Sequence, residues 1–188
     1  MGRWPEGARS RLADAALELF AERGFADTTV PQIATRAGLT TRTFFRHFSD
    51  KREVLFAYQA ELPDLVRQVM ADIPPSSSPL QVIADGLRRV AESRFDGRRE
   101  QLRAHRAIIG ADDGLREREL RKMSILSEAI GQGFRDRGVD ELTSTLAAHT
   151  AATVLGVALN RWFDSADERT LSDHVADTLA ALESLTVA

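Results

Sequence analysis

The chain has 188 residues, of which 43% are hydrophobic, and this is enough for one compact domain or for a small domain joined to a larger one. It has no cysteine, which excludes disulfides, thiolate metal sites and cysteine nucleophiles. No uninterrupted apolar run approaches the roughly 20 residues that span a bilayer, and the first residues lack the apolar core of a signal peptide, so we expect no membrane segment.

The formal net charge of −3 is divided unevenly along the chain. Residues 1–58 hold 9 basic and 7 acidic side chains, whereas residues 59–188 hold 16 and 21. The N-terminal part is therefore the basic one, by a small margin. A phosphate-binding module requires this sign of charge, so we expect any contact with nucleic acid to come from residues 1–58.

The first predicted helix runs from Ala8 to Arg23, because apolar residues recur in it at helical spacing and Gly24 then stops the run. We expect its apolar face to pack on Ile33, Phe44 and Phe48, which would close a small three-helix core. The apolar residues of this face are Leu12, Ala16, Leu19 and Phe20.

Two short helices joined by a tight turn are predicted within Thr28–Leu55. Thr29 and Gln32 have the spacing of a capping box at the start of the first of these helices. Gly38 falls where the chain must take a positive φ angle, and Thr40 can cap the second helix. This arrangement is the helix-turn-helix, whose second helix enters the major groove of DNA by its N-terminal end.

The residue types in this motif also resemble a narrower pattern, the signature of the TetR family of bacterial transcriptional repressors. A bare helix-turn-helix pattern is a weak signal, but this many residue types at fixed offsets are a strong one. The matching residues are Ile33, Ala34, Ala37, Gly38, Leu39, Thr40, Thr43, Phe44, Phe45, His47, Phe48, Asp50, Lys51 and Leu55.

The resemblance implies an all-α fold of two domains. Residues 6–66 would form a three-helix DNA-binding domain with the helix-turn-helix motif at residues 29–48, and residues 67–188 a larger helical domain for ligand binding and dimerisation. It further implies a homodimer in the bacterial cytoplasm that binds double-stranded DNA at a palindromic operator, with half-sites about 34 Å apart, and is released by a small-molecule effector. The alternative is a constitutive DNA-binding or adaptor protein with no small-molecule ligand.

The resemblance also assigns DNA contacts one position at a time. Arg42 is expected to read bases, since an arginine fork bonds two acceptors of guanine at once. Phe45 departs from the family pattern, which usually has tyrosine there, and it lacks the hydroxyl that would bond a phosphate. Arg46 either compensates for this loss or is simply solvated. The full set of expected DNA-binding residues is Thr29, Thr40, Thr41, Arg42, Thr43, Phe45, His47 and Lys51, the last two as phosphate contacts.

A short basic arm formed by Arg3, Arg9 and Arg11 lies at the start of the chain. In the family such arms sometimes reach the backbone or the minor groove of the adjoining DNA. A frayed terminus without a function is the alternative, and the sequence leaves both open.

A fourth helix is predicted from Lys51 to Val69, and Pro63 inside it should kink the helix or divide it into two pieces. Because this helix links the two domains in the family, we expect a pivot at Pro63. A Pro- and Ser-rich break follows at residues 74–79, and the rest of the chain is helical in pattern. The later predicted helices are Leu80–Phe95, Arg99–Ile109, Leu115–Arg135, Leu142–Phe163 and Leu171–Leu185.

The last two predicted helices carry apolar residues, over much of the circumference in Leu142–Phe163 and in a stripe in Leu171–Leu185. Family members dimerise by pairing these two helices with their symmetry mates. Closing the core of the monomer is the alternative, and we expect both roles at once.

The larger domain has enough apolar side chains to line a cavity, and Arg99, Arg103 and Arg106 form a cationic row at helical spacing. The segment Leu102–Leu126 resembles part of a subgroup of actinobacterial regulators with an acyl-CoA-like ligand. The alternative is that the apolar residues are packed core and the arginines pair with acidic neighbours on the surface. The residues expected at the ligand are Arg103, Arg106, Met123, Leu126, Ile130 and Trp162.

The sequence contains no catalytic pattern. Its 4 histidines stand far apart, and Gly131 and Gly133 are not followed by the third glycine of a nucleotide-binding loop. We therefore predict no metal site, no cofactor and no enzymatic activity.

Overall fold

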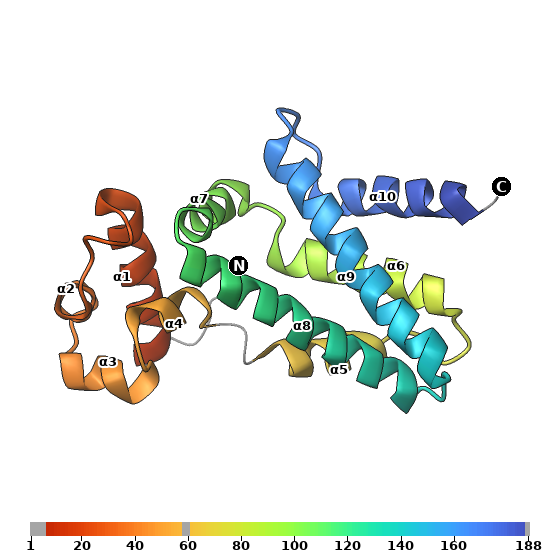
Figure 1. Cartoon of the computed structure of the whole chain (residues 1–188), viewed down its shortest axis with the longest axis horizontal. Helices are drawn as coiled ribbons and strands as arrows, with labels where there is room; N and C mark the ends of the chain where they lie inside the picture. Colours follow the sequence, from red (N-terminus) through yellow and green to blue (C-terminus); the bar gives the residue numbers. More distant parts are fainter. Residues whose placement is uncertain (1–6, 58–60, 187–188) are drawn as a thin grey trace. The chain divides into compact units, whose positions relative to one another are not determined.

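The computed structural model describes residues 7–57 and 61–186, and within them it contains helices and no strand (Figure 1). The predicted all-α fold is therefore confirmed. The described residues form two compact units. The first consists of residues 7–57 with Arg103–Glu119, and the second of Glu61–Leu102 with the residues from Leu120 onward.

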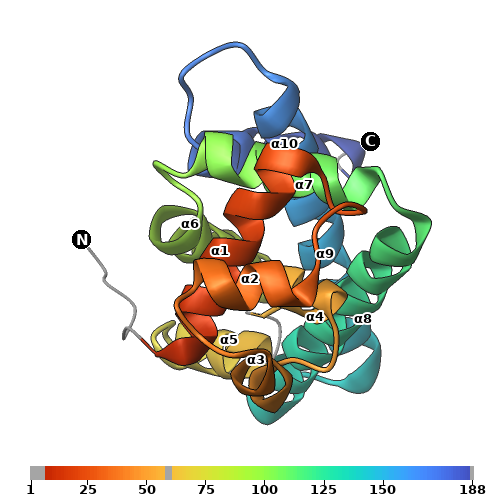
Figure 2. The same ribbon diagram turned by 90° about the vertical axis from the view of Figure 1, so that its left-hand side faces the viewer.

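The first unit is built on one long helix that packs against three short ones. The four helices are α1 (Ala8–Arg23), α2 (Val30–Arg36), α3 (Thr41–His47) and α4 (Lys51–Leu55). Figure 2 shows α2 lying across α1. The apolar face of α1 packs on Ile33, Phe44 and Phe48, which are at most 1% exposed, so the predicted three-helix core is confirmed.

The first unit also contains a segment that the sequence did not assign to it. Helices α7 (Arg99–Gly110) and α8 (Asp113–Asp136) contribute residues to both units, and Ile109 and Leu115 from the corner between them lie in the core of the first. The compact units separate before Glu61, whereas the sequence analysis placed a domain boundary after residue 66. That functional boundary stays a prediction.

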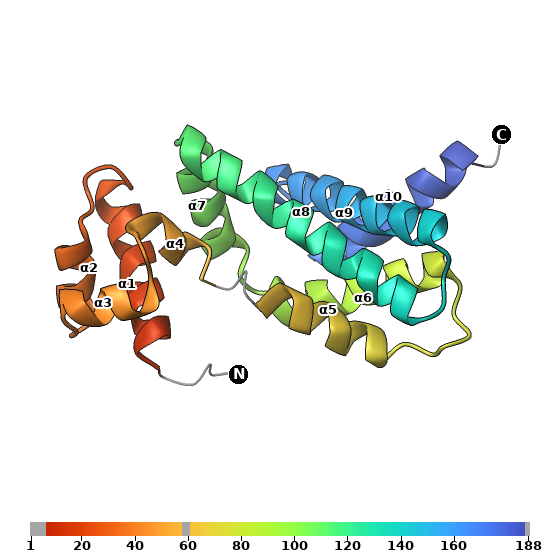
Figure 3. The same cartoon turned by 60° about the horizontal axis from the view of Figure 1, so that its bottom comes forward.

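The second unit buries its apolar side chains between six helices. Helix α10 packs on both α9 and α6, and Figure 3 shows α8 running beside α9. Phe134 of α8, Leu155 of α9 and Val175 of α10 meet in one core. The helices that belong only to this unit are α5 (Leu62–Ala71), α6 (Pro79–Arg94), α9 (Glu141–Asp164) and α10 (Leu171–Thr186).

Two glycines of α8 allow neighbouring helices to approach closely. A Cβ atom added to Gly133 would lie 2.2 Å from Sδ of Met70 on α5. A Cβ atom added to Gly131 would lie 3.6 Å from Cβ of Ala148 on α9. Both glycines are buried in the middle of a helix, so their role is in helix packing, in agreement with the absence of a nucleotide-binding loop in the sequence.

The predicted helix from Lys51 to Val69 is divided into two pieces, which is one of the two outcomes expected from Pro63. Helix α4 ends at Leu55 and α5 begins at Leu62, which places Pro63 in the first turn of α5. The missing N–H of a proline has no intrahelical partner to lose in a first turn. The alternative of a kink inside one continuous helix is therefore corrected, and the pivot stays a prediction. Residues 58–60 of this predicted helix lie outside the described residues.

Helix α9 has the length and composition of a membrane span, although polar residues interrupt its apolar sequence. Its most apolar window has a mean hydropathy of 1.4, and 39% of that window is buried inside the chain. The interior helices of water-soluble proteins meet the same criterion, and α9 packs on α6 and α10.

Candidate DNA-binding site

Helix α2 and the turn that follows it form as the sequence predicts. Oε1 of Gln32 accepts a hydrogen bond from the backbone N of Thr29 at 2.9 Å, which is one half of the predicted capping box. Gly38 has a φ angle of +67°, and the backbone N of Leu39 donates to Ala34 O at 2.8 Å. The turn between α2 and α3 therefore requires glycine at this position.

Helix α3 starts at a threonine cap and buries its aromatic face. Oγ1 of Thr40 accepts from the backbone N of Thr43 at 3.1 Å, and the two hydroxyl oxygens are 3.0 Å apart. Phe44 and Phe48 are 0% and 1% exposed. Because these rings face the core, the opposite side of α3 must face outward.

The outward side of α3 presents two arginines and an aromatic ring. Arg42 and Arg46, one turn apart, are exposed, and neither has a hydrogen bond or ion pair with any residue of the described ranges. Phe45 between them is 56% exposed, and its ring stands edge-on to the ring of Phe44 with centroids 5.5 Å apart. This face can therefore offer ten guanidinium N–H donors beside a rigid apolar surface.

The predicted threonine contacts divide into two kinds. Thr29 and Thr40 are exposed, while Thr41 and Thr43 are half-buried. The hydroxyls of Thr40 and Thr43 already contact each other in the helix cap. These two bonds use one hydroxyl proton and part of the lone pairs, so the cap leaves only one proton and the remaining lone pairs for another partner.

His47 is oriented differently from the predicted phosphate contact. Its Nε2 atom is buried and has no hydrogen-bond partner in the part of the chain that the structure describes, and its backbone oxygen accepts from Arg9 at 3.0 Å. A buried ring nitrogen does not face solvent, so the expected contact of this side chain with phosphate stays a prediction that the geometry does not support.

Lys51 also departs from the expected phosphate contact, because its ammonium group is occupied within the unit. Nζ donates to the backbone oxygens of Phe25, Ala26 and Thr28 at 2.7, 3.0 and 2.8 Å. It also lies 4.5 Å from the centroid of the Phe25 ring. Burial lowers the pKa of this ammonium group, and the positive charge of the adjacent Arg52 lowers it further.

Arg9 is an internal residue of the unit and not part of a basic arm. Its guanidinium donates to His47 O at 3.0 Å and to Ala57 O at 2.9 Å, and it lies 4.7 Å from the centroid of the Phe48 ring. The sequence could have indicated that Arg9 lies on the buried face of α1, because it precedes the buried Ala13 and Ala16 by four and seven residues. Arg11 is exposed, and Arg3 lies outside the described residues.

Residues of α7 and α8 that belong to the first unit contact α4 and its N-cap. Nε2 of His105 lies 2.9 Å from Leu55 O, and Arg118 forms an ion pair with Asp50 at 3.3 Å. Asp50 in turn caps α4 by accepting from the backbone N of Glu53 at 2.8 Å. These contacts could not be predicted from the sequence, because the residues are separated by 50 positions or more.

The residues predicted at a ligand are divided between a packed core and the first unit. Leu126, Ile130 and Trp162 are 8%, 8% and 2% exposed and belong to one packed core, with Met123 partly buried against it. Nε1 of Trp162 donates to Arg169 O at 3.2 Å. The other two predicted residues, Arg103 and Arg106, belong to the first unit.

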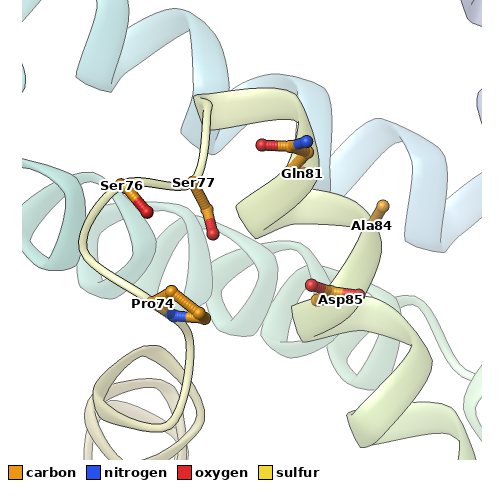
Figure 4. Close-up of a pocket in the computed structure, with 6 residues that line it drawn as sticks. All are labelled: Pro74, Ser76, Ser77, Gln81, Ala84 and Asp85. Carbon is orange, nitrogen blue, oxygen red and sulfur yellow. The ribbon is translucent and has the colours of Figure 1, made fainter.

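Two hollows on the described surface lie elsewhere. The larger, about 580 Å³ and open to solvent, lies at the start of α6 and is lined by Pro74, Ser76, Ser77, Gln81, Ala84 and Asp85 (Figure 4). The other, about 280 Å³, lies between α1 and α2 and is lined by Leu19, Arg23, Gln32, Thr35 and Arg36. Neither contains a residue that the sequence predicted at a ligand.

The three arginines of the predicted cationic row lie on α7, but the first of them, Arg99, is bonded within the second unit. Arg99 donates to the backbone oxygens of Trp162 and Ser165, the latter at 2.6 Å, and so closes the loop after α9.

Within residues 7–57 and 61–186, no three histidine, aspartate or glutamate side chains are placed to hold a metal ion.

Comparison with known proteins agrees with the geometry of the motif. Residues 12–58 match the family described as bacterial regulatory proteins, tetR family. The chain is 36% identical over 92 residues to the HTH-type transcriptional regulator TcmR of Streptomyces glaucescens, which covers 49% of this chain and 41% of TcmR. It is 29% identical over 166 residues to the transcriptional regulator MftR of Mycobacterium tuberculosis, which covers 86% of this chain and 81% of MftR.

The first curated relatives are matched over less than half of their length. A solved structure covers much more of the chain: FadR of Thermus thermophilus, a TetR-family transcriptional repressor in complex with lauroyl-CoA, covers 96% of this chain and 95% of its own. The TM-score is 0.57 and the identity 23%, which supports a common fold. These relatives are transcriptional regulators, in agreement with the prediction that the chain is not an enzyme. Residues 12–58 therefore match the tetR family of bacterial regulatory proteins, and the whole chain has the fold of a solved TetR-family regulator.

Proposed function

We propose that this chain is a homodimeric transcriptional regulator of the bacterial cytoplasm that inserts α3 into the major groove of a palindromic operator. The observation that carries this proposal is the outward face of α3, where Arg42 and Arg46 are exposed and unpaired among the described residues. A recognition helix needs free donors on one face and a buried apolar face behind them.

Individual roles follow from exposure and chemistry. Arg42, near the N-terminal end of α3, reads a guanine through its two forked donors. Phe45 places its exposed ring against a sugar or a thymine methyl group, and Arg46 supplies the charge to phosphate that the absent tyrosine hydroxyl does not. Thr29, Thr40 and Thr41 supply hydroxyl oxygens and backbone amides at the phosphate backbone.

Dimerisation through the last two helices is supported by the apolar residues that the single chain leaves exposed. Leu142, Leu146 and Val157 of α9 are 69%, 60% and 43% exposed and follow one face of the helix, and Leu185 of α10 is 77% exposed. Apolar residues that are exposed at helical spacing indicate a surface that another helix covers.

Dimerisation is tested by Leu146→Glu, with Leu120→Glu as its control on another exposed leucine. Burying a leucine contributes about 1.5–3 kcal/mol, so loss of this contact should raise the dimer dissociation constant at least about tenfold. Sedimentation velocity measures the change. A dimer that dissociates equally in the two variants would contradict the assignment of this face.

We further propose that the chain is a repressor released by a hydrophobic or acyl-CoA-like effector, as the lauroyl-CoA complex of FadR suggests. An effector must bind the DNA-incompetent state more tightly than the DNA-competent one. Because Leu126 and Ile130 are packed together, an effector at these residues must separate α8 from its neighbours. Helix α8 also supplies Leu115 to the first unit, so movement of α8 is a route to the DNA-binding helices.

A constitutive DNA-binding or adaptor protein is the second candidate, and the packed core favours it. Thermal denaturation with and without lauroyl-CoA separates the two candidates. A rise in the melting temperature at saturating ligand, together with loss of DNA binding, supports the effector-controlled repressor. An unchanged melting temperature supports the constitutive regulator.

DNA binding itself is tested by selecting bound duplexes from random sequence with the purified full chain. An enriched palindrome with half-sites about one helical turn apart supports a dimer with two recognition helices in the major groove. Failure to enrich any sequence, or enrichment of a single unrepeated half-site, would contradict the proposal.

A further inference from the structure

We propose that Lys51 is a positioning residue of the DNA-binding site and not a ligand of phosphate. Its ammonium group joins the start of α4 to the turn between α1 and α2, and so sets the place where α2 begins. The proposal rests on the proposed DNA-binding function and concerns which basic residues perform it.

The hydrogen bonds of Lys51 account for every donor that it has. An ammonium group carries three N–H donors and no acceptor. Three backbone oxygens, of Phe25, Ala26 and Thr28, lie 2.7–3.0 Å from Nζ. A phosphate oxygen could be bound only after one of these bonds is broken, and the electron-rich face of the Phe25 ring covers a further side of the charge.

The turn that Lys51 contacts lies directly before α2. The chain leaves α1 at Gly24 with a φ angle of +85°, and the hydroxyl of the buried Thr28 donates to Gly24 O at 2.8 Å. Thr28 precedes Thr29, the N-cap of α2. The carbonyl groups of this turn lie outside the hydrogen-bond ladders of helices, and Lys51 supplies charge-assisted donors to three of them.

A second cation acts in the same way at the other end of the motif. Arg9 donates to His47 O, the last residue of α3, and to Ala57 O after α4. The helix-turn-helix is therefore held at its start by Lys51 and at its end by Arg9, both through backbone oxygens. The cations left for DNA on this motif are those of the outward face of α3.

The first test compares operator binding by two variants, one of which separates a positioning role from a phosphate contact. Lys51→Arg keeps the charge, and arginine binds phosphate at least as well as lysine, so a phosphate contact would survive it. A planar guanidinium does not match three carbonyl oxygens that converge on one point. We expect Lys51→Arg and Lys51→Met to weaken operator binding alike, about tenfold. Full affinity in Lys51→Arg would overturn the proposal.

The salt dependence of binding supplies the readout that a purely structural defect would not imitate. Each neutralised phosphate contributes about 0.9 to the slope of log K against log salt concentration. We expect the slope of Lys51→Met to equal that of the unmodified chain, while Arg46→Ala, the matched control, loses about 0.9. A loss of about 0.9 in Lys51→Met would identify a phosphate contact.

The second test needs no variant, because the chain has only two lysines, Lys51 and Lys122. Reductive methylation of the native chain, with the denatured chain as reference, measures how accessible each amine is. We expect Lys51 to react slowly in the free protein, with the same rate when operator DNA is added. Fast reaction in the free protein, or protection that appears only with DNA, would overturn the proposal.

These outcomes are separate from those of the proposed function. If the unmodified chain enriches no DNA sequence, the proposed function fails, and the methylation rate of the free protein still reports on the contacts of Lys51. If it binds an operator and Lys51→Arg binds equally well, only the positioning role fails.

Discussion

The two compact units use their basic side chains differently. In the second unit, Arg99 donates to Ser165 O at 2.6 Å and Arg137 donates to Met70 O and Ile73 O at 3.0 and 3.1 Å, so both close loops between helices. In the first unit, Lys51 and Arg9 do the same, but α3 carries further basic residues on its outward face.

The outward arginines of α3 differ in their surroundings from the arginines that close loops in the second unit. Arg42 and Arg46 have no partner among the described residues, whereas Arg99 and Arg137 donate to backbone oxygens. Loop carbonyls bind cations well because they lie outside helical ladders. A row of basic residues in a sequence therefore indicates a ligand site only where the fold leaves the side chains unsatisfied.

The core of the second unit depends on buried apolar side chains. Phe134→Ala tests this dependence and is the substitution with the largest expected effect. Phe134 is 1% exposed in the core of the second unit, and removal of its ring should lower the free energy of unfolding by about 3–5 kcal/mol. Leu120→Ala is the control, since Leu120 is 72% exposed and should change stability by less than about 0.5 kcal/mol.

Urea denaturation followed by circular dichroism measures both variants. If the core of the second unit is as tightly packed as its buried residues indicate, only Phe134→Ala is strongly destabilised. A loss of less than about 1 kcal/mol in Phe134→Ala would mean that the core has space to rearrange, and would strengthen the case for an internal effector site.

Arg42→Ala tests base reading by the first unit, and its effect on operator affinity is the next largest. A bidentate contact to a base contributes about 1–3 kcal/mol of discrimination, so affinity for the selected operator should fall about 10- to 100-fold. Binding to unrelated DNA should change little. The control Arg46→Ala should weaken binding to all sequences alike, and equal losses on every sequence for Arg42→Ala would contradict base reading.

The sequence predicted the elements of the first unit well because local chemistry determines them. Thr40 and Asp50 occupy the N-cap positions that their side chains favour, and Gly38 has the positive φ angle that the tight turn requires. Helix ends depend on such short-range hydrogen bonds, so their residue types can be recognised without a structure.

What the sequence could not predict is which long-range partner each polar side chain would find. Lys51 and Phe25 are 26 residues apart, and Arg9 and Ala57 are 48 apart. Resemblance assigned Lys51 to phosphate, and only the folded arrangement reveals the carbonyl oxygens around it. Pro63 indicated that the Lys51–Val69 helix could divide, but the end of α4 at Leu55 was not predicted, since the apolar period continues beyond it.

The effector site was the least predictable feature, because core residues and cavity-lining residues have the same composition. Leu126, Ile130 and Trp162 would satisfy either role on apolar character alone. The difference lies in whether neighbouring side chains fill the space between them, and this depends on packing across several helices.

The smallest expected effect concerns how carboxylates cap helices. In the first unit, Asp50 caps α4 and pairs with Arg118 at 3.3 Å, so a cation balances its charge. In the second unit, Asp96 accepts from the backbone N of Leu171 at 3.3 Å, at the start of α10, without a basic partner among the described residues. Burial raises the pKa of Asp96 above its ordinary 3.8, and the nearby Glu92 and Asp173 raise it further.

The raised pKa sets the sign of the pH dependence, because the folded chain then holds the Asp96 proton more tightly than the unfolded chain. The stability that this proton contributes is complete below the unfolded pKa and is lost as the pH rises through the folded value. Asp96→Asn keeps an acceptor for Leu171 without the charge, so its melting temperature relative to the unmodified chain should rise slightly from pH 4 to pH 7. Asp140→Asn is the control with opposite sign, because the backbone N of Thr143 lowers the pKa of Asp140. Equal pH profiles in all three proteins would show that Asp96 is hydrated as freely as an exposed carboxylate.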